Sequence, residues 1–412
     1  MLRSICISAV LAASFAATSG QAAVFAVDST ADLADLAPGN GVCDANPTAA
    51  VVCTLRAAVQ EANALAGNDS ISLPAGTYAL TRAGLDSTAD KGDLDVTSVI
   101  SIAGAGPGLS VIEQTTADRV FEVWLPPSAL SLFDVTVRGG DAGPTGLGGG
   151  IRNVGLLSLA GVHLTDNAAQ YGGGLFNFGS VQIADSVIDA NVATVRIAGI
   201  ASASVSASGN ESTYLEMYSS TVGPNITTGG PTEIEFGNGN SAMLFDSTIA
   251  PMDPGAVAID VANENVVLDH VTMRGGLRTY SFDGSQTLTI SNSVVEWCAF
   301  NGAQQPLIER LGSDASSDGS CGFAAAGGIE GPLGLGALAD NGGLSPTYLP
   351  QPGSALIDAA STDVCRTTDQ RGIDRPQGAA CDIGAVEVVP ESSAIGAALA
   401  AIASLAWLRR RI

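Results

Sequence analysis

Four residues in the middle of the chain have the types and the spacing of an acid–base site. Asp185, Asp246 and His270 occupy the same position of a weak repeat, and Arg274 follows His270 by four residues. Hydrolysis of a glycosidic bond needs two carboxyl groups about 5–10 Å apart. Two layers of stacked strands, at about 4.8 Å each, would place Asp185 roughly 10 Å from Asp246. The four residues are therefore candidates for the acid, the base and the electrostatic stabiliser of a polysaccharide hydrolase or lyase.

The repeated position also has an explanation without chemistry. Its seven occupants are Asp134, Gly161, Asp185, Ser219, Asp246, His270 and Asn292. Gly, Asn and Asp adopt a left-handed backbone conformation at little cost, so this column is typical of tight corners. A second position six residues later predicts a second corner. Its occupants are Gly140, Asn167, Asn191, Asn225, Met252, Gly276 and Cys298. We favour corner conformation over catalysis as the reason for the first column.

The segments between the corners alternate apolar and polar residues, which indicates short strands. Examples are Leu157-Ser158-Leu159 and Val181-Gln182-Ile183, and successive copies of the repeat lie 22 to 34 residues apart. No segment with helical periodicity separates them. This pattern predicts an all-β chain wound as a parallel β-helix, a solenoid of stacked coils. A β-sandwich is the main alternative, but it needs antiparallel hairpins with two-residue turns, and the regular spacing fits it less well.

A short helix precedes the repeat. Leu55, Val59, Ala62 and Ala66 fall on one face of a helical segment, with Arg56, Gln60, Glu61 and Asn63 elsewhere, and Gly67 ends it. A stack of coils leaves unpaired strand edges at its ends, and these edges must be covered. We therefore predict that this helix caps the N-terminal end of the stack.

The composition limits the possible partners. The 412 residues carry a net charge of -24, and 46% of them are hydrophobic. This hydrophobic content is too high for a disordered polyanion, and the acidity argues against binding to nucleic acid or to an anionic membrane surface. It also disfavours acidic polysaccharides unless Ca²⁺ bridges the charges. Five aromatic residues could stack on sugar rings, although we favour packing in the core: Trp124, Trp297, Tyr171, Phe176 and Phe178.

The N-terminal end predicts export. Arg3, an apolar run from Ile5 to Ala17 and small residues up to Ala22 are typical of a secretory signal that is cleaved after Ala22. Six cysteines then remain, and an even number in an exported chain favours disulfides over zinc ligands, since no C-x-x-C motif occurs. Proximity along the chain favours the pairs Cys43–Cys53, Cys298–Cys321 and Cys365–Cys381.

Two regions resemble domains of secreted bacterial proteins. The N-terminal region is similar to the CSLREA family in three segments: Cys53-Thr54-Leu55-Arg56-Ala57-Ala58, Ile71 to Tyr78, and Gly104-Ala105-Gly106. The C-terminal part is similar to the choice-of-anchor Q domain in four motifs: Leu338 to Gly343, Pro352 to Asp358, Asp369 to Gly372, and Cys381 to Glu387. These resemblances imply a right-handed parallel β-helix exported to the cell surface, and they imply no particular reaction.

The fold and the C-terminal end suggest two further features. Lyases with this fold hold Ca²⁺ on carboxylates, and Asp314 and Asp318 are candidate ligands, although the serines between them favour a solvated loop. The C-terminal end resembles a PEP-CTERM sorting tail. It contains Pro390-Glu391, an apolar run from Ala394 to Leu408 and the final Arg409, Arg410 and Arg411, with Ser392 in place of that family's second Pro. A plain membrane anchor is the alternative, and sorting or processing machinery is the expected partner of the tail.

We therefore divide the chain into five parts: a signal peptide (1–22), an N-terminal cap (23–70), β-helix coils (71–332), an anchor-Q-like region (333–388) and a sorting tail (389–412). The expected function is that of a non-catalytic protein of the cell surface or extracellular space, engaged in adhesion, matrix structure or contact with an extracellular polysaccharide. The alternative is a polysaccharide lyase or glycoside hydrolase that uses the four residues named first.

Overall fold

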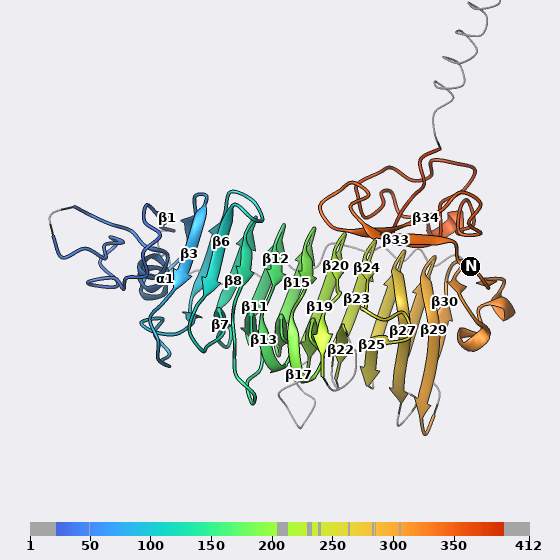
Figure 1. The fold of residues 1–412 in the computed structure, drawn as a ribbon, viewed down its shortest axis with the longest axis horizontal. Helices are drawn as coiled ribbons and strands as arrows, with labels where there is room; N and C mark the ends of the chain where they lie inside the picture. Colours follow the sequence, from blue (N-terminus) through green and yellow to red (C-terminus); the bar gives the residue numbers. More distant parts are fainter. Residues whose placement is uncertain are drawn as a thin grey trace, which may run out of the picture.

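The chain winds into a stack of coils in which each strand pairs in parallel with the equivalent strand of the next coil (Figure 1). The computed structural model describes residues 22–390 except 49, 204–212, 229–232, 238–239, 263, 282–283, 285 and 305. Its all-β, parallel topology confirms the predicted right-handed parallel β-helix and excludes the β-sandwich. The predicted signal peptide lies outside the described residues except for Ala22, and so does the sorting tail beyond Pro390.

The strands form three long faces. The first face is a single sheet of β1 (Val24–Ala26), β2 (Asn68–Ser72), β5 (Val99–Ala103), β8 (Ala129–Phe133), β11 (Leu156–Ala160), β15 (Ser180–Ala184), β19 (Thr213–Tyr218), β23 (Asn240–Phe245), β26 (Asn265–Asp269), β28 (Thr287–Ser291) and β30 (Leu307–Arg310). The second face contains β3 (Gly76–Leu80), β6 (Ser110–Gln114), β9 (Thr136–Arg138), β12 (His163–Thr165), β16 (Val187–Asp189), β20 (Thr221–Val222), β24 (Thr248–Ile249), β31 (Ala315–Ser316) and β32 (Ile329–Glu330).

The third face contains β4 (Leu94–Val96), β7 (Phe121–Val123), β10 (Ile151–Asn153), β14 (Leu175–Asn177), β18 (Ile200–Ser202), β22 (Ile234–Phe236) and β25 (Val257–Ala262). Two long strands, β27 (Thr272–Ser281) and β29 (Val294–Gly302), belong to both the second and the third face and join them into one sheet. A small sheet of β13 (Ala168–Tyr171), β17 (Val192–Arg196) and β21 (Ile226–Thr227) lies beside these faces.

Aliphatic side chains fill the interior because alternate residues of every strand point inward. On the first face, Leu130 pairs with Leu157 and Leu157 pairs with Val181, and all three are buried. Equivalent residues of successive coils therefore stack directly on one another, and the core runs along the whole stack.

The first predicted corner is confirmed. All seven residues of that column, which separates the first face from the second, have positive φ values between 42° and 63°. Because an ordinary side chain is strained in this conformation, the column favours Asp, Asn and Gly. The one Gly, Gly161, adopts the conformation without that strain.

The second predicted corner is wrong in its position and in its cause. The left-handed residues are Gly139, Asp166 and Ala190, one position earlier than predicted. The column itself provides a ladder of buried asparagine side chains. Asn191 Oδ1 accepts hydrogen bonds from both the backbone N and the Nδ2 of Asn167, at 3.1 and 3.0 Å. The asparagines are therefore required for the hydrogen bonds of their side chains and not for their backbone conformation.

The predicted helix caps the N-terminal end, as α1 (Leu55–Ala64). Thr54 caps it by accepting the amide N–H of Ala57 at 3.1 Å. Arg56, Gln60 and Glu61, which lie outside the apolar face of the helix, are buried as well. The segment before the helix covers them, and Glu61 accepts the amide N–H groups of Gly39 and Gly41 there.

The C-terminal region folds back onto the second face (Figure 1). It contains an antiparallel pair, β33 (Leu335–Ala339) and β34 (Thr347–Pro350), and the 3₁₀ turn Thr362–Val364. The side chain of Gln370 is buried against the coils, where it bonds with Thr248 Oγ1 at 2.6 Å and Thr221 Oγ1 at 2.9 Å. The region thus covers the C-terminal half of the second face.

Three disulfides join the pairs that proximity favoured: Cys43–Cys53, Cys298–Cys321 and Cys365–Cys381. The second pair ties β29 to the 3₁₀ turn Gly319–Cys321, which is followed by another at Ala324–Ala326. Among the described residues, no helix has the length and apolar character needed to cross a membrane.

Candidate functional site

On the third face, one side chain per coil points away from the coil interior, and these side chains form a straight row. The strand pairing places these residues in register: Asp95, Glu122, Arg152, Phe176, Ala201, Glu235, Asp260 and Arg278. Glu122, Arg152, Glu235 and Arg278 are partly exposed, whereas Asp95, Phe176, Ala201 and Asp260 are buried. Each lies between two inward-facing residues, as Asp95 lies between Leu94 and Val96. Parallel strands are about 4.8 Å apart, so this outward row repeats at that interval along the stack.

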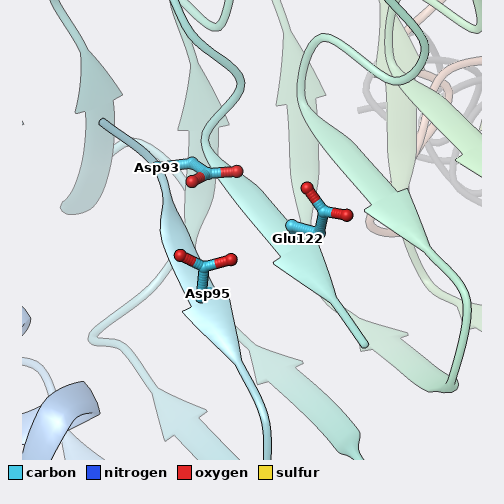
Figure 2. Close-up of side chains that lie close together, drawn as sticks. All are labelled: Asp93, Asp95 and Glu122. Atoms are coloured by element: carbon cyan, nitrogen blue, oxygen red, sulfur yellow. The ribbon is translucent and has the colours of Figure 1, made fainter. Parts of the chain in front are cut away.

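Carboxylates gather at the N-terminal end of the outward row (Figure 2). Asp93 precedes β4, Asp95 lies on β4 and Glu122 lies on β7, and one carboxylate oxygen of each lies within 4.8 Å of the others. Glu122 forms ion pairs with Arg119, at 2.6 Å, and with Arg152. Asp95 accepts the indole N–H of Trp124 at 2.8 Å and the amide N–H of Ala89 at 3.1 Å.

Burial controls the charge of this cluster. Burial, and then the carboxylates of Asp118 and Asp95, raise the pKa of Asp93 to about 8, and Arg119 opposes them. Burial also raises the pKa values of Asp95 and Asp118. Asp93 is therefore largely protonated at neutral pH, next to Glu122, whose carboxyl group pairs with Arg119 and Arg152.

The cluster is the one group among the described residues whose geometry could bring three carboxylates to a metal ion. Oxygen donors of this kind suit Ca²⁺ or Mg²⁺. However, the oxygens of Glu122 already bond to arginines, and those of Asp95 already accept N–H groups. A cation would have to displace these partners, so the residues do not fit a resident metal.

The predicted calcium ligands Asp314 and Asp318 do not form a site either. Asp314 is buried, and its carboxylate accepts the amide N–H of Ser293 at 3.1 Å. Asp318 is exposed and caps the 3₁₀ turn by accepting the amide N–H of Ser320 at 2.9 Å. The two carboxylates have separate structural roles, because one supports a coil and the other starts a turn.

An apolar cluster occupies the middle of the outward row. Phe176, Ile197 and Ala201 are buried together outside the main core, with Tyr171 and Phe178 packed against them. The ring centroids of Phe176 and Phe178 are 4.6 Å apart. Phe176 is therefore packed in a hydrophobic core, as predicted, but in a small separate cluster outside the coil interior, because the strand direction points it outward. Tyr171 and Phe178 are only partly buried against this cluster.

The two tryptophans also lie outside the coil interior. Trp124 is 39% exposed. Trp297 lies against Gly276, where a Cβ atom would come within 2.2 Å of the indole ring. This close approach explains a glycine at position 276, which the sequence pattern had attributed to a corner.

Carboxylates and arginines return at the C-terminal end of the row. Arg278 donates two hydrogen bonds to Asp260, at 3.1 and 2.5 Å. Arg196 pairs with Glu235 and lies 3.5 Å from Asp260. Every carboxylate of the outward row therefore has an arginine or N–H partner.

Two of the four predicted catalytic residues belong to one buried cluster. Arg366 of the C-terminal region pairs with Asp246 and lies 3.5 Å from Asp269, while Nδ1 of His270 lies 2.8 Å from Asp269 Oδ1. The side chains of Asp246 and His270 are only 7% and 0% exposed. Burial raises the pKa of Asp246 to about 7 and lowers that of His270. The cluster joins the C-terminal region to the coils and offers little access to a polymer.

The other two predicted residues lie apart from this cluster. Arg274 bonds to Glu296 at 3.1 Å, and its guanidinium lies 5.4 Å from the ring centroid of Tyr348. Asp185 is exposed at its corner, two coils closer to the N-terminus than Asp246. The four residues therefore do not come together as one site. Sequence reasoning missed the outward row, although triplets such as Leu94-Asp95-Val96 and Phe121-Glu122-Val123 carried its signal.

Comparison with known proteins gives matches of structure only. No protein-family model matches the chain, and no curated protein matches it. Pectate lyase Pel9A matches with 13% identity over 90% of this chain and 97% of that chain, at a TM-score of 0.45. The A-module of mannuronan C-5 epimerase AlgE4 from Azotobacter vinelandii matches with 18% identity over 71% of this chain and 93% of that chain, at a TM-score of 0.32.

Proposed function

We propose that this chain is an exported β-helix protein that binds an extracellular polysaccharide along the outward row of the third face, without a covalent reaction. The observation that carries the proposal is the register of the row, which sets charged and apolar side chains at a constant interval over consecutive coils. A linear polymer of repeating units is the kind of ligand that such a surface fits.

The side chains of the row suit sugar hydroxyls. Arg152 and Arg278 provide N–H donors, and carboxylates such as Glu235 provide acceptors. Because the charges are paired, the row does not select strongly for a charged polymer. Between the two charged ends, the partly exposed rings of Tyr171 and Phe178 pack on the buried Phe176 and give a small nonpolar surface, where the C–H face of a sugar ring can pack.

The pairing of charges also supports binding over catalysis. An acid and a base or nucleophile must be free to reach the glycosidic bond. In the outward row, Glu122, Glu235 and Asp260 are each held by arginine. These carboxyl groups already interact with arginines of the protein, so they are not free to act on a glycosidic bond.

Affinity electrophoresis of the exported protein through gels that contain neutral or acidic polysaccharides tests the proposal. We expect retardation by at least one polysaccharide, and Arg152→Gln should reduce it. The matched control is Arg138→Gln, because Arg138 forms a similar half-exposed pair with Glu113 on the second face. Equal effects of the two substitutions, or no retardation by any polysaccharide, would contradict the proposal.

A polysaccharide lyase or glycoside hydrolase is the second candidate. The observation in its favour is the carboxyl pair of Asp93, whose pKa is raised to about 8 and whose side chain is 4% exposed, and Glu122, whose side chain is 14% exposed. Incubation with the same polysaccharides, with and without Ca²⁺, would then yield new reducing ends or unsaturated products. Turnover that disappears in Asp93→Asn would support this candidate and replace the non-catalytic proposal.

We also propose export to the cell surface and sorting through the C-terminal tail. Three disulfides are typical of oxidising compartments outside the cytosol. The intact mass of the exported protein tests the tail. A mass that lacks residues 394–412 supports processing, whereas a mass that includes them supports a retained anchor.

A further inference from the structure

The first face carries a second group of outward side chains, separate from the outward row. Tyr214, Glu216 and Tyr218 alternate along β19 and all three are partly exposed. In the strand register, Glu216 lies between Gln182 of β15 and Met243 of β23. We call these five residues, together with Phe245 beside Tyr218, the tyrosine platform.

Hydrogen bonds hold the polar centre of the platform in place. Gln182 Nε2 donates to Glu216 Oε2 at 3.0 Å, and the hydroxyl of Tyr218 donates to Glu216 Oε1. A carboxylate offers about four lone-pair positions. Glu216 therefore keeps acceptor capacity for further hydroxyl donors while its orientation is fixed.

Ring contacts hold the aromatic part. The rings of Tyr218 and Phe245 are stacked, with centroids 5.0 Å apart and planes inclined by 14°. The guanidinium of Arg366 lies 4.6 Å from the centroid of Phe245, on the side of the C-terminal region. The hydroxyl of Tyr214 lies 3.7 Å from the sulfur of Met243. Tyr214 and Tyr218 are four residues apart on one strand, so their Cα atoms are about 13 Å apart along it.

We propose that the tyrosine platform binds a neutral polysaccharide of pyranose units whose hydroxyls are equatorial, such as a β-linked glucan. The axial C–H groups of such sugars form flat apolar faces that pack on tyrosine rings, and their equatorial hydroxyls donate to Glu216. The ionised carboxylate between the rings repels polyuronates. The proposal rests on the proposed function in that the ligand is a carbohydrate, but the site is a different one.

The charge of the surroundings also favours a neutral ligand over an acidic one. The overall charge of -24 opposes acidic polymers. The neighbouring cation, Arg366, is engaged by Asp246 and Asp269. A neutral glycan requires no counter-charge and gains from both ring faces and fixed hydrogen-bond acceptors.

The test is affinity electrophoresis of the full exported chain in hydroxyethylcellulose, a soluble β-glucan, and in polygalacturonate. We expect hydroxyethylcellulose to retard the protein. The double variant Tyr214→Ala/Tyr218→Ala should weaken this binding about tenfold or more. Tyr218→Phe, which keeps the ring, should weaken it by less than about threefold. Thermal unfolding identifies any variant that fails to fold, and Tyr218→Phe keeps the test valid if the double variant does fail.

Phe133→Ala is the matched control. Phe133 is 38% exposed on the same face and in the same column of the sheet as Tyr218, but its neighbours in that column are Ala103 and Ala160. We expect this variant to bind hydroxyethylcellulose as the wild type does.

Loss of binding with Arg152→Gln but not with the tyrosine variants would overturn the platform and leave the outward row in place. Failure of hydroxyethylcellulose to bind while polygalacturonate binds would also overturn the platform, and failure of all polysaccharides would overturn both proposals.

Discussion

Arg56 and Asp32 form an ion pair that is almost completely removed from solvent. Arg56 Nε lies 2.5 Å from Asp32 Oδ1, and the two side chains are 0% and 2% exposed. The guanidinium also donates to the backbone carbonyls of Ala89, Gly92 and Asp93, at 2.9 to 3.2 Å. One side chain of α1 thus joins the N-terminal segment to the loop that leads into β4. This loop carries Asp93 of the carboxylate cluster, so the cap also positions the start of the outward row.

We predict that Arg56→Lys destabilises the protein by about 3 kcal/mol. Lysine keeps the charge but cannot reproduce the planar fork of donors, so it leaves buried carbonyls and part of Asp32 without partners. Urea unfolding measures the loss. The control is Arg82→Lys in the same region, because Arg82 forms an ion pair with Asp90 in which both side chains are about one-third exposed. That substitution should change stability by less than about 1 kcal/mol. Similar losses for both variants would contradict a special role of Arg56.

The sequence was sufficient to predict the coil topology and one of its corners. The first column was recognisable because the backbone conformation itself restricts which residues fit, and six non-glycine residues there have positive φ. The second column was recognised as a pattern but misassigned. Asn167 and Asn191 suit a left-handed corner as well as a side-chain ladder, and only the placement of neighbouring coils distinguishes the two.

The functional residues were harder to predict for a similar reason. Asp246 and His270 were candidates because they share a column, but the C-terminal region that buries them begins about 90 residues after Asp246 in the chain. Asp95, Glu122 and Arg152 are each the one charged residue of a three-residue strand. Their alignment depends on loops of different lengths returning the chain to the same register, which no local pattern specifies.

We predict that Asp185 tolerates glycine but not valine. Its φ of 50° strains a β-branched side chain most, so Asp185→Val should destabilise the protein by about 1–2 kcal/mol. Asp185→Gly relieves the strain but loses more chain entropy on folding, so its effect should stay within about 1 kcal/mol. Thermal unfolding measures both, with Gln182→Val on the exposed side of β15 as the control for adding a valine. A destabilising glycine and a harmless valine would show that the side chain of Asp185 matters more than its backbone.

The asparagine ladder predicts a pH-dependent effect of a single charge. In the wild type, Asn191 Nδ2 donates a hydrogen bond to Asn225 Oδ1 at 3.0 Å. Asn191→Asp replaces this donor with a carboxylate oxygen that faces Asn225 Oδ1. We expect a loss of about 3 kcal/mol at pH 8. The loss should be smaller at pH 4, because the buried acid holds its proton more tightly in the folded chain than in the unfolded one. Asn265→Asp, at an exposed position of β26, is the control and should change stability by less than about 0.5 kcal/mol. A pH-independent loss at position 191 would contradict the ladder's need for a neutral side chain.

We predict that Asp93 makes the stability of the protein fall as the pH rises. Its pKa is raised from 3.8 to about 8 in the folded chain, chiefly by burial and then by Asp118 and Asp95. Between these two values the folded state holds a proton that the unfolded state has released, so stability falls with rising pH and the fall ends near pH 8. Asp93→Asn removes the titrating group and keeps its shape. We expect the wild type to lose more than about 1.4 kcal/mol relative to this variant between pH 5 and pH 8 in urea unfolding.

A carboxyl ¹³C resonance that titrates near pH 8 and is absent from Asp93→Asn would assign the effect to this residue. Parallel stability curves for the two proteins would show instead that Arg119 keeps Asp93 ionised, and the acid–base pair with Glu122 would then lose its support.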